Sequence, residues 1–146
     1  MTSPIDQTEN ARYTEATRIF SEGKFAEAHL IFSQLAENGN MKAQTAIGNL
    51  FAGGHGVKQD YSTAMEWYQQ AAKQGSPVAL YNIYQLYANG QGVPKSDEKA
   101  FPWLRAAAEA GQKSAMYNLW LAYINGYGTK ADPSSGLPWL KLAPKI

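Results

Sequence analysis

The sequence contains no cysteine among its 146 residues, and this absence excludes several kinds of site. Disulfide bonds, a thiolate nucleophile and zinc held by cysteine all require that residue. The net charge is only +1, so we do not expect the strongly basic surface of a DNA- or RNA-binding protein. No run of apolar residues approaches the roughly 18 that a membrane-spanning helix needs, so no membrane partner is expected.

The N-terminal residues also lack a targeting pattern. The segment MTSPIDQTENARY has neither a basic start nor an apolar core, so it does not match a secretory signal peptide. A chain of 146 residues matches one domain and is long enough to bury a core without disulfide bonds. We therefore expect a single soluble domain over residues 1–146, located in the cytoplasm.

Aromatic residues, glycines and alanines recur every 36 residues. Residues 41–76 and 77–112 are identical at 12 of 36 positions, and residues 77–110 and 113–146 at 11 of 34, without any gap. The recurrence is clearest in these series: Trp67, Trp103 and Trp139; Gly54, Gly90 and Gly126; Ala43, Ala79 and Ala115. This period indicates three repeats, 41–76, 77–112 and 113–146, the last of them truncated. Residues 8–40 form a shorter, degenerate first repeat.

Each repeat has the pattern of two helices. In the first repeat unit, apolar residues follow the i, i+3, i+4, i+7, i+8 spacing of one helical face: Ala43, Ala46, Ile47, Leu50 and Phe51. Two glycines follow, and a second apolar stripe begins at Tyr61 after Asp60, which is suited to cap a helix N-terminus. The sequence therefore predicts an all-α fold of about four helical hairpins.

Residues 43–75, AQTAIGNLFAGGHGVKQDYSTAMEWYQQAAKQG, resemble the Sel-one-like repeat (SLR) family. The family's unit reads A-x-x-x-L-G-x-x-Y, then G-x-G-V, then K-A-x-x-W-Y-x-x-A-A-x-x-G. The resemblance covers residues 41–146 well and 8–40 loosely. It implies an α/α solenoid, a right-handed superhelix related to tetratricopeptide arrays. It further implies an adaptor or scaffold that binds proteins or peptides on its concave side.

Two first helices depart from the family pattern by being apolar on a second face. The small residue Gly48 is replaced by Tyr84 in the next repeat and by Trp120 in the last. Tyr and Trp are enriched at binding hot spots because they combine a large rigid surface with a polar group. We predict a concave protein-binding patch formed by Tyr81, Tyr84, Gln85, Tyr117, Trp120, Leu121 and Ile124. In the alternative, Tyr84 and Trp120 pack between the hairpins as core residues.

The sequence offers no constellation for catalysis, metal or cofactor binding. Its two histidines, His29 and His55, are not at the i, i+3 or i, i+4 spacing of a metal pair. We expect His55 to be a solvated loop residue and His29 a partly exposed helix residue. The loops GGHGV, NGQGV and NGYGT lack the phosphate-binding motifs, and no nucleophile elbow is present. The prediction is a non-enzyme without metal or cofactor.

The expected function is binding of a protein or peptide partner as an adaptor or scaffold. One alternative is an immunity protein that neutralises a cognate bacterial toxin, as the resemblance implies for some bacterial members. A second alternative is a small-ligand binder or enzyme that uses the concave groove. The last predicted helix is short and broken by glycine and proline, whereas solenoids need polar caps at their ends. We therefore expect a partner, or a second copy in a homodimer, to cover this C-terminal end.

Overall fold

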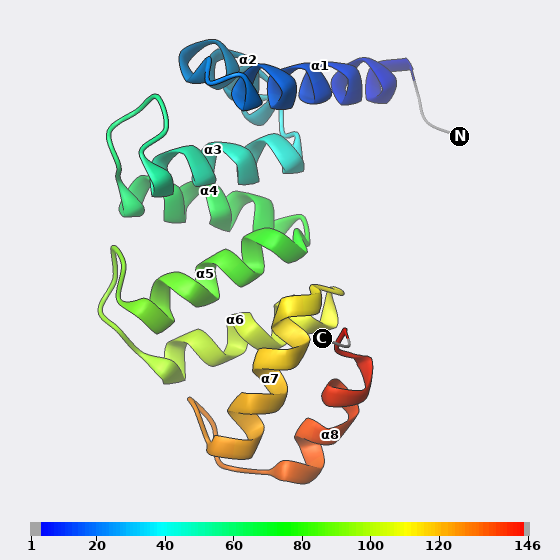
Figure 1. Ribbon diagram of the computed structural model, residues 1–146, viewed down its shortest axis with the longest axis vertical. Coiled ribbons are helices and arrows are strands. Elements are labelled where there is room, and N and C mark those ends of the chain that lie inside the picture. Colours follow the sequence, from blue (N-terminus) through cyan, green and yellow to red (C-terminus); the bar gives the residue numbers. More distant parts are fainter. Residues whose placement is uncertain (1–3, 145–146) are drawn as a thin grey trace. The chain divides into compact units, whose positions relative to one another are not determined.

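The computed structural model describes residues 4–144, and within this range the chain forms eight α-helices and no strand (Figure 1). The prediction of an all-α fold is confirmed. The helices are α1 (Pro4–Ser21), α2 (Phe25–Glu37), α3 (Met41–Gly53), α4 (Tyr61–Lys73), α5 (Pro77–Asn89), α6 (Asp97–Glu109), α7 (Lys113–Asn125) and α8 (Pro133–Leu142).

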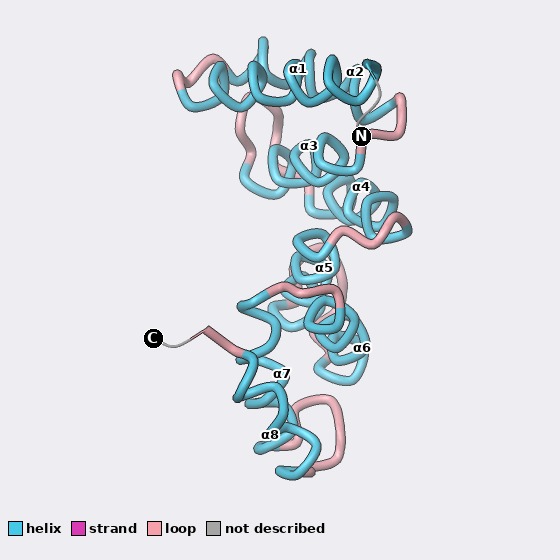
Figure 2. The backbone as a smooth tube through the Cα atoms, turned by 90° about the vertical axis from the view of Figure 1, so that its right-hand side faces the viewer, coloured by secondary structure: helices cyan, strands magenta, loops and turns pink. Residues whose placement is uncertain are grey.

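Helix boundaries follow the sequence period. Helices α3, α5 and α7 begin at residues 41, 77 and 113, and α4, α6 and α8 begin at 61, 97 and 133. Within each of these repeats, the first helix ends at a glycine with positive φ: Gly54 (68°), Gly90 (67°) and Gly126 (74°). The degenerate first repeat has only a short turn between α1 and α2, and α1 begins at Pro4, earlier than its apolar pattern predicts. Figure 2 shows this alternation of helices and connecting loops.

Contacts within the chain group it into two compact units, Met1–Ala71 and Ala72–Ile146, which are described separately here. In the first unit, α2 packs against both α1 and α3. Its core is formed by these buried side chains: Ala16, Ile19, Ala28, Phe32, Leu35, Ala36, Ala43, Ile47 and Leu50. In the second unit, α6 packs against α5 and α7, and α7 packs against α8. Its core is formed by Leu80, Leu104, Ala107, Ala108, Ala115, Met116, Leu119 and Ala122.

A close contact inside the first unit explains why one repeat keeps a glycine where the others carry an aromatic ring. A Cβ atom at Gly48 of α3 would overlap the ring of Tyr68 on α4, 2.5 Å from its Cδ1. Tyr68 is buried, and its hydroxyl donates a 2.6 Å hydrogen bond to Oδ1 of Asn49. One repeat later Tyr84 stands at the glycine position and Leu104 at the Tyr68 position. The volume removed from one helix is thus restored on its partner, as close packing requires.

The glycine-rich loops dock onto the start of an earlier second helix. A Cβ at Gly56 would lie 2.7 Å from Cβ of Phe25, the first residue of α2. A Cβ at Gly128 would overlap the carbonyl oxygen of Asp97, the first residue of α6. Both glycines have a positive φ, +72° at Gly56 and +73° at Gly128. The loops are therefore structural elements that fix neighbouring hairpins, in addition to linking two helices.

Candidate functional site

The predicted patch lies on two first helices of the second unit, α5 and α7. Gln85, Tyr117 and Ile124 are exposed, with 38% of Tyr117 and 37% of Ile124 accessible. Tyr81, Tyr84, Trp120 and Leu121 are half-buried. We call these seven residues together with Asn118 the α5–α7 surface. None of the seven predicted residues is fully buried, so each retains some surface that a partner could contact.

A hydrogen bond joins the two helices across this surface. Nδ2 of Asn118 donates to the hydroxyl oxygen of Tyr81 at 2.7 Å. Burial raises the pKa of Tyr81, and the hydrogen bond from Asn118 opposes that shift. Sequence reasoning missed Asn118, although its identity with Asn82 at the 36-residue spacing was a signal.

The aromatic rings on each helix form a pair. The ring centroids of Tyr81 and Tyr84 are 5.5 Å apart at 35°, and those of Tyr117 and Trp120 are 5.4 Å apart at 47°. These separations lie within the range of favourable aromatic contacts. Each pair sits at i, i+3 on its helix, so rotation of one ring is restricted by the other. The helices thus present two ordered aromatic groups.

Trp120 also contributes to packing against α8. A Cβ placed at Gly136 of α8 would lie 3.4 Å from Cδ1 of Trp120 and 2.9 Å from Cβ of Tyr123. Gly136 is the buried residue of α8. The half-buried indole is therefore shared between the α7–α8 contact and the surface.

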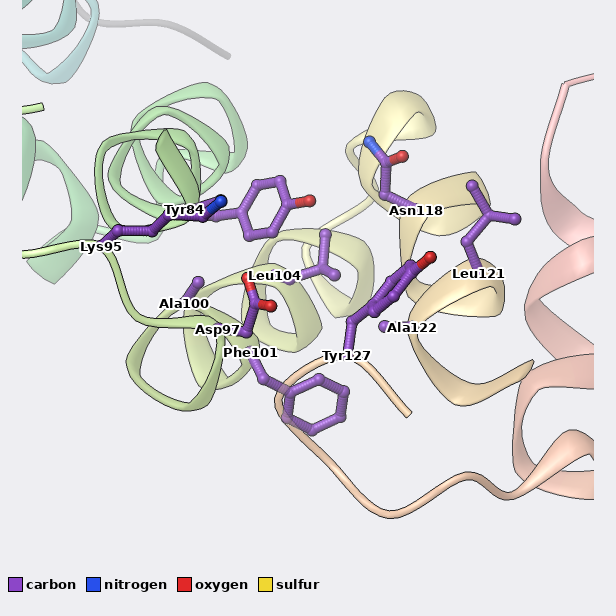
Figure 3. Close-up of a pocket in the computed structure, with 11 residues that line it drawn as sticks. Tyr84, Lys95, Asp97, Ala100, Phe101, Leu104, Asn118, Leu121, Ala122 and Tyr127 are labelled. Atoms are coloured by element: carbon purple, nitrogen blue, oxygen red, sulfur yellow. The ribbon is translucent and has the colours of Figure 1, made fainter. Parts of the chain in front are cut away.

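A cavity of about 260 Å³ opens beside Tyr84, and we call it the Asp97 cavity (Figure 3). It is bounded by α5, α6, α7 and the loop after α7. Its lining residues are Tyr84, Ala88, Lys95, Asp97, Ala100, Phe101, Leu104, Asn118, Leu121, Ala122 and Tyr127. Burial, followed by the charges of Tyr81 and Asp97, raises the pKa of Tyr84. The hydroxyl of Tyr84 therefore stays protonated at neutral pH and can donate a hydrogen bond.

A second hollow of about 350 Å³ lies next to the exposed ring of Tyr117. Tyr81, Lys113, Ser114, Asn118 and Pro144 complete its lining. Asn118 lines both this hollow and the Asp97 cavity. The hydrogen-bonded pair Tyr81–Asn118 thus lies where the two depressions of the α5–α7 surface meet.

The first unit contains a cavity of about 170 Å³ at the corresponding place. Its lining residues are Tyr13, Thr17, Phe20, Phe32, Ala46, Asn49, Leu50 and His55. Five of these positions recur in the Asp97 cavity 72 residues later, as Leu104, Asn118, Leu121, Ala122 and Tyr127. The cavity is therefore a feature of the repeat geometry, and only its chemical lining changes.

The two histidines lie in packed surroundings. The His55 ring contacts Phe20 and Phe25 at centroid distances of 5.7 and 5.3 Å. The side chain is exposed in the loop after α3, as predicted, and its ring in addition anchors the loop on these two phenylalanines. His29 is half-buried, with Nδ1 3.5 Å from Oγ of Ser33. Among the described residues, no three side chains of His, Asp or Glu gather as a metal site would require.

Helices of the described part of the chain are too short or too polar to cross a membrane. The model of the Sel1 repeat matches residues 42–76, 77–112 and 113–143. Each matched segment spans one pair of helices: α3 and α4, α5 and α6, and α7 and α8.

Two solved structures are similar over most of this chain. One is c5321, a protective antigen present in uropathogenic Escherichia coli strains that displays an SLR fold. It has a TM-score of 0.86, 27% identity, and coverage of 92% of this chain and 30% of that one. The other is a Sel1 repeat protein from Oxalobacter formigenes, with a TM-score of 0.80, 27% identity, and coverage of 92% and 56%.

This chain therefore spans between about a third and just over half of the length of these two proteins. No curated protein sequence matches it. The structural similarity confirms the predicted α/α solenoid fold class. Because the family model matches three consecutive repeats that make up most of its residues, the chain belongs to the Sel1 repeat family.

Proposed function

We propose that the chain is a non-catalytic binding protein, an adaptor or scaffold that holds a protein or peptide on its α5–α7 surface. Sel1 repeat proteins generally mediate protein–protein interaction. The observation that carries the proposal is the pair of ordered aromatic groups joined by the Tyr81–Asn118 hydrogen bond. A surface whose side chains are already ordered loses little conformational entropy on binding.

The exposure of individual residues supports a binding role over a purely structural one. Tyr117 and Ile124 are both more than one-third accessible on α7, one helical face of which is already used in the core. Large apolar side chains that stay accessible beside ordered aromatic rings have the composition of a binding hot spot. Trp120, which contacts Gly136, contributes to both packing and the surface.

The test is affinity capture from a lysate of the source organism, with the chain and its Tyr117→Ala variant as parallel baits. Leu30→Ala is the matched control, because Leu30 is a 61% exposed apolar side chain on α2, which belongs to the first compact unit and contributes no residue to the α5–α7 surface. We expect a partner that binds the unchanged chain and Leu30→Ala but not Tyr117→Ala. Tyr117→Ala should melt within a few degrees of the unchanged chain, since exposed substitutions usually change stability by less than about 0.5 kcal/mol.

The outcomes are distinct. If the purified partner binds the unchanged chain, Leu30→Ala and Tyr117→Ala equally, the α5–α7 surface is refuted as the binding site. A partner that is a secreted bacterial toxin, inhibited on binding, would establish the immunity role in place of the adaptor role. Absence of any protein partner would favour the small-ligand alternative. The Asp97 cavity, at about 260 Å³, is smaller than the ~300–1,000 Å³ of most ligand pockets, so such a ligand would fit better in the hollow of about 350 Å³ beside Tyr117.

The C-terminal helix α8 is the region where we expect a second copy to bind. Leu137, Leu140 and Leu142 are exposed to 47%, 38% and 58%. Apolar side chains exposed together on one helix are typical of a surface that binds another protein or a second copy of the same chain. Multi-angle light scattering at high concentration should detect a dimer that Leu137→Glu dissociates, and a monomer at all concentrations would refute the homodimer. The expected cytoplasmic location stays a prediction from the sequence.

A further inference from the structure

The Asp97 cavity combines aromatic rings with a negative charge. Tyr84, Phe101 and Tyr127 contribute rings from α5, α6 and the loop after α7, and Asp97 contributes a carboxylate from the start of α6. Figure 3 shows the side chains of Tyr84, Asp97 and Tyr127 directed toward the same space. The faces of aromatic rings carry a partial negative charge that attracts cations. The aromatic rings and the carboxylate therefore both favour a positively charged ligand.

Within the described part of the chain, the exposed carboxylate of Asp97 forms no hydrogen bond or ion pair. Lys95, two residues earlier, lies outside ion-pair distance of it. Oγ of Ser96 caps α6 by accepting from the backbone N–H of Lys99, so Asp97 is not needed as the cap. Burial first, and then the charges of Tyr81 and Asp97, raise the pKa of Tyr84. Asp97 and Lys95 are the two charged residues that line the cavity, and Asp97 is its one carboxylate.

We infer that the Asp97 cavity binds a basic side chain, arginine or lysine, of the protein partner. This inference rests on the proposed function and specifies the partner's chemistry. The volume of about 260 Å³ is suited to one long side chain rather than to a whole cofactor. The cation would lie between the carboxylate of Asp97 and the rings of Tyr84 and Tyr127. The side-chain oxygen of Asn118 can accept a further hydrogen bond from it.

The corresponding cavity in the first unit provides an internal comparison. Its lining contains no carboxylate, and Phe25 stands 72 residues before Asp97. The repeat fold therefore forms this cavity without an acidic residue at its edge. An acid at position 97 is thus a local addition to the common geometry.

Selectivity for a cation has to arise inside the cavity. Residues 72–146 contain eight Lys or Arg and four Asp or Glu, so their summed charge would repel a basic ligand at long range. The short-range contacts oppose this repulsion, because a hydrogen bond to an ionised partner contributes about 1.5–3 kcal/mol. Removing Lys95, which lines the cavity, should therefore strengthen cation binding, while removing the charge of Asp97 should weaken it.

The test uses Nα-acetyl-arginine methylamide as the probe and the full chain as the protein. Nα-acetyl-citrulline methylamide is the neutral probe of matched shape. Binding is followed by NMR, through the side-chain amide signals of Asn118 and the backbone amides of residues 126–132. We expect saturable shifts with the arginine probe and affinity at least about tenfold weaker for citrulline, which corresponds to the loss of one charge-assisted hydrogen bond.

Four variants test the assignment, each checked for an unchanged melting temperature. Asp97→Asn should weaken binding of the arginine probe by about tenfold, and Tyr127→Ala should weaken it by about threefold. Glu98→Gln is the matched control because Glu98 is the other acidic residue of the same helix turn and does not line the cavity, so it reports the effect of removing a nearby negative charge. Lys95→Met should increase the affinity for the arginine probe. Equal weakening by Asp97→Asn and Glu98→Gln, or equal binding of citrulline and arginine, would overturn the inference.

An acidic ligand would give the reverse pattern. Nα-acetyl-glutamate methylamide should not bind, and binding that Lys95→Met abolishes would identify an anion site and refute the inference. The outcome is separable from that of the proposed function. If the arginine probe behaves as expected but capture yields no protein partner, the cavity stands as a cation site and the adaptor role fails. If a partner is captured but tolerates Asp97→Asn, the adaptor role stands and the cavity assignment fails.

Discussion

Substitution of Gly128 by alanine should destabilise the second unit more than the loss of a flexible glycine alone would. The added Cβ would overlap the carbonyl oxygen of Asp97 and lie 2.6 Å from the carbonyl carbon and 3.0 Å from Cβ of Phe101. Favourable carbon–carbon contacts occur at roughly 3.5–4.0 Å. Two of these neighbours are backbone atoms of a helix N-terminus, which cannot move without shifting α6.

The magnitude follows from two terms. An alanine at φ +73° is in the left-handed region, which costs about 1–2 kcal/mol for a residue with a Cβ. Overpacking against a rigid neighbour adds about 1–3 kcal/mol. The expected loss for Gly128→Ala is therefore about 2–5 kcal/mol. Gly111→Ala supplies the control, because Gly111 has φ +99° and no atom within 4 Å of the added Cβ. The free energy of unfolding that Gly111→Ala loses should be only the cost of placing alanine in a backbone conformation with positive φ.

The assay is urea unfolding of both variants, followed by tryptophan fluorescence. Both glycines lie within Ala72–Ile146, so both substitutions are reported by the same unit. We expect Gly128→Ala to lose at least about 1 kcal/mol more free energy of unfolding than Gly111→Ala. The φ angle of Gly111 is less suited to alanine than that of Gly128. The difference between the two variants therefore underestimates the free-energy cost of the steric contact at Gly128. Equal losses in the two variants would refute the argument that the loop docks on α6 through Gly128.

Two further predictions concern packing and pH. Gly48→Ala should lower the free energy of unfolding of the unchanged chain by about 1–3 kcal/mol. In a Tyr68→Leu background the same substitution should be neutral or stabilising, because leucine leaves the space of the ring empty. Equal losses in the two backgrounds, measured by urea unfolding, would contradict this exchange of volume between the two positions. Hydrogen bonds, chiefly from the side-chain hydroxyl three residues later, lower the pKa of Asp60 and of Asp132 below the ordinary 3.8. A lowered folded-state pKa stabilises the protein above pH 3.8, and this contribution is lost as the pH falls through the folded-state value. Replacing both by Asn, which still caps a helix, should flatten the acid limb of a stability–pH curve below about pH 4, and an unchanged acid limb would exclude these caps as its origin.

The sequence predicted the fold because the 36-residue period and the helical spacing are direct records of local structure. Helices α3, α5 and α7 begin at residues 41, 77 and 113, where the period of recurring tryptophans, glycines and alanines places the start of each repeat. Equally, Tyr117 was expected on an accessible face, and it is exposed. These features depend on one helix at a time, which periodicity describes well.

The contacts between helices could not be read from the same pattern. The Tyr81–Asn118 hydrogen bond joins residues 37 apart, and it depends on the rotation of two helices about their axes. Whether Trp120 is core or surface also depended on α8, where Gly136 makes room for the indole. Asp97 is in sequence an ordinary acid at a helix start, and only the approach of Gly128 brings Tyr127 over it.

The repeat geometry separates what forms a cavity from what it binds. Glycines at positions 56 and 128 each bring a loop against the first residue of a helix, and the residue before each glycine lines a cavity, as His55 in one case and Tyr127 in the other. Because the backbone that forms these cavities depends on glycines with positive φ, the adjacent side chains can change without loss of the fold. The two cavities illustrate this within one sequence, because His55 and Tyr127 stand at equivalent positions 72 residues apart and give the cavities different linings.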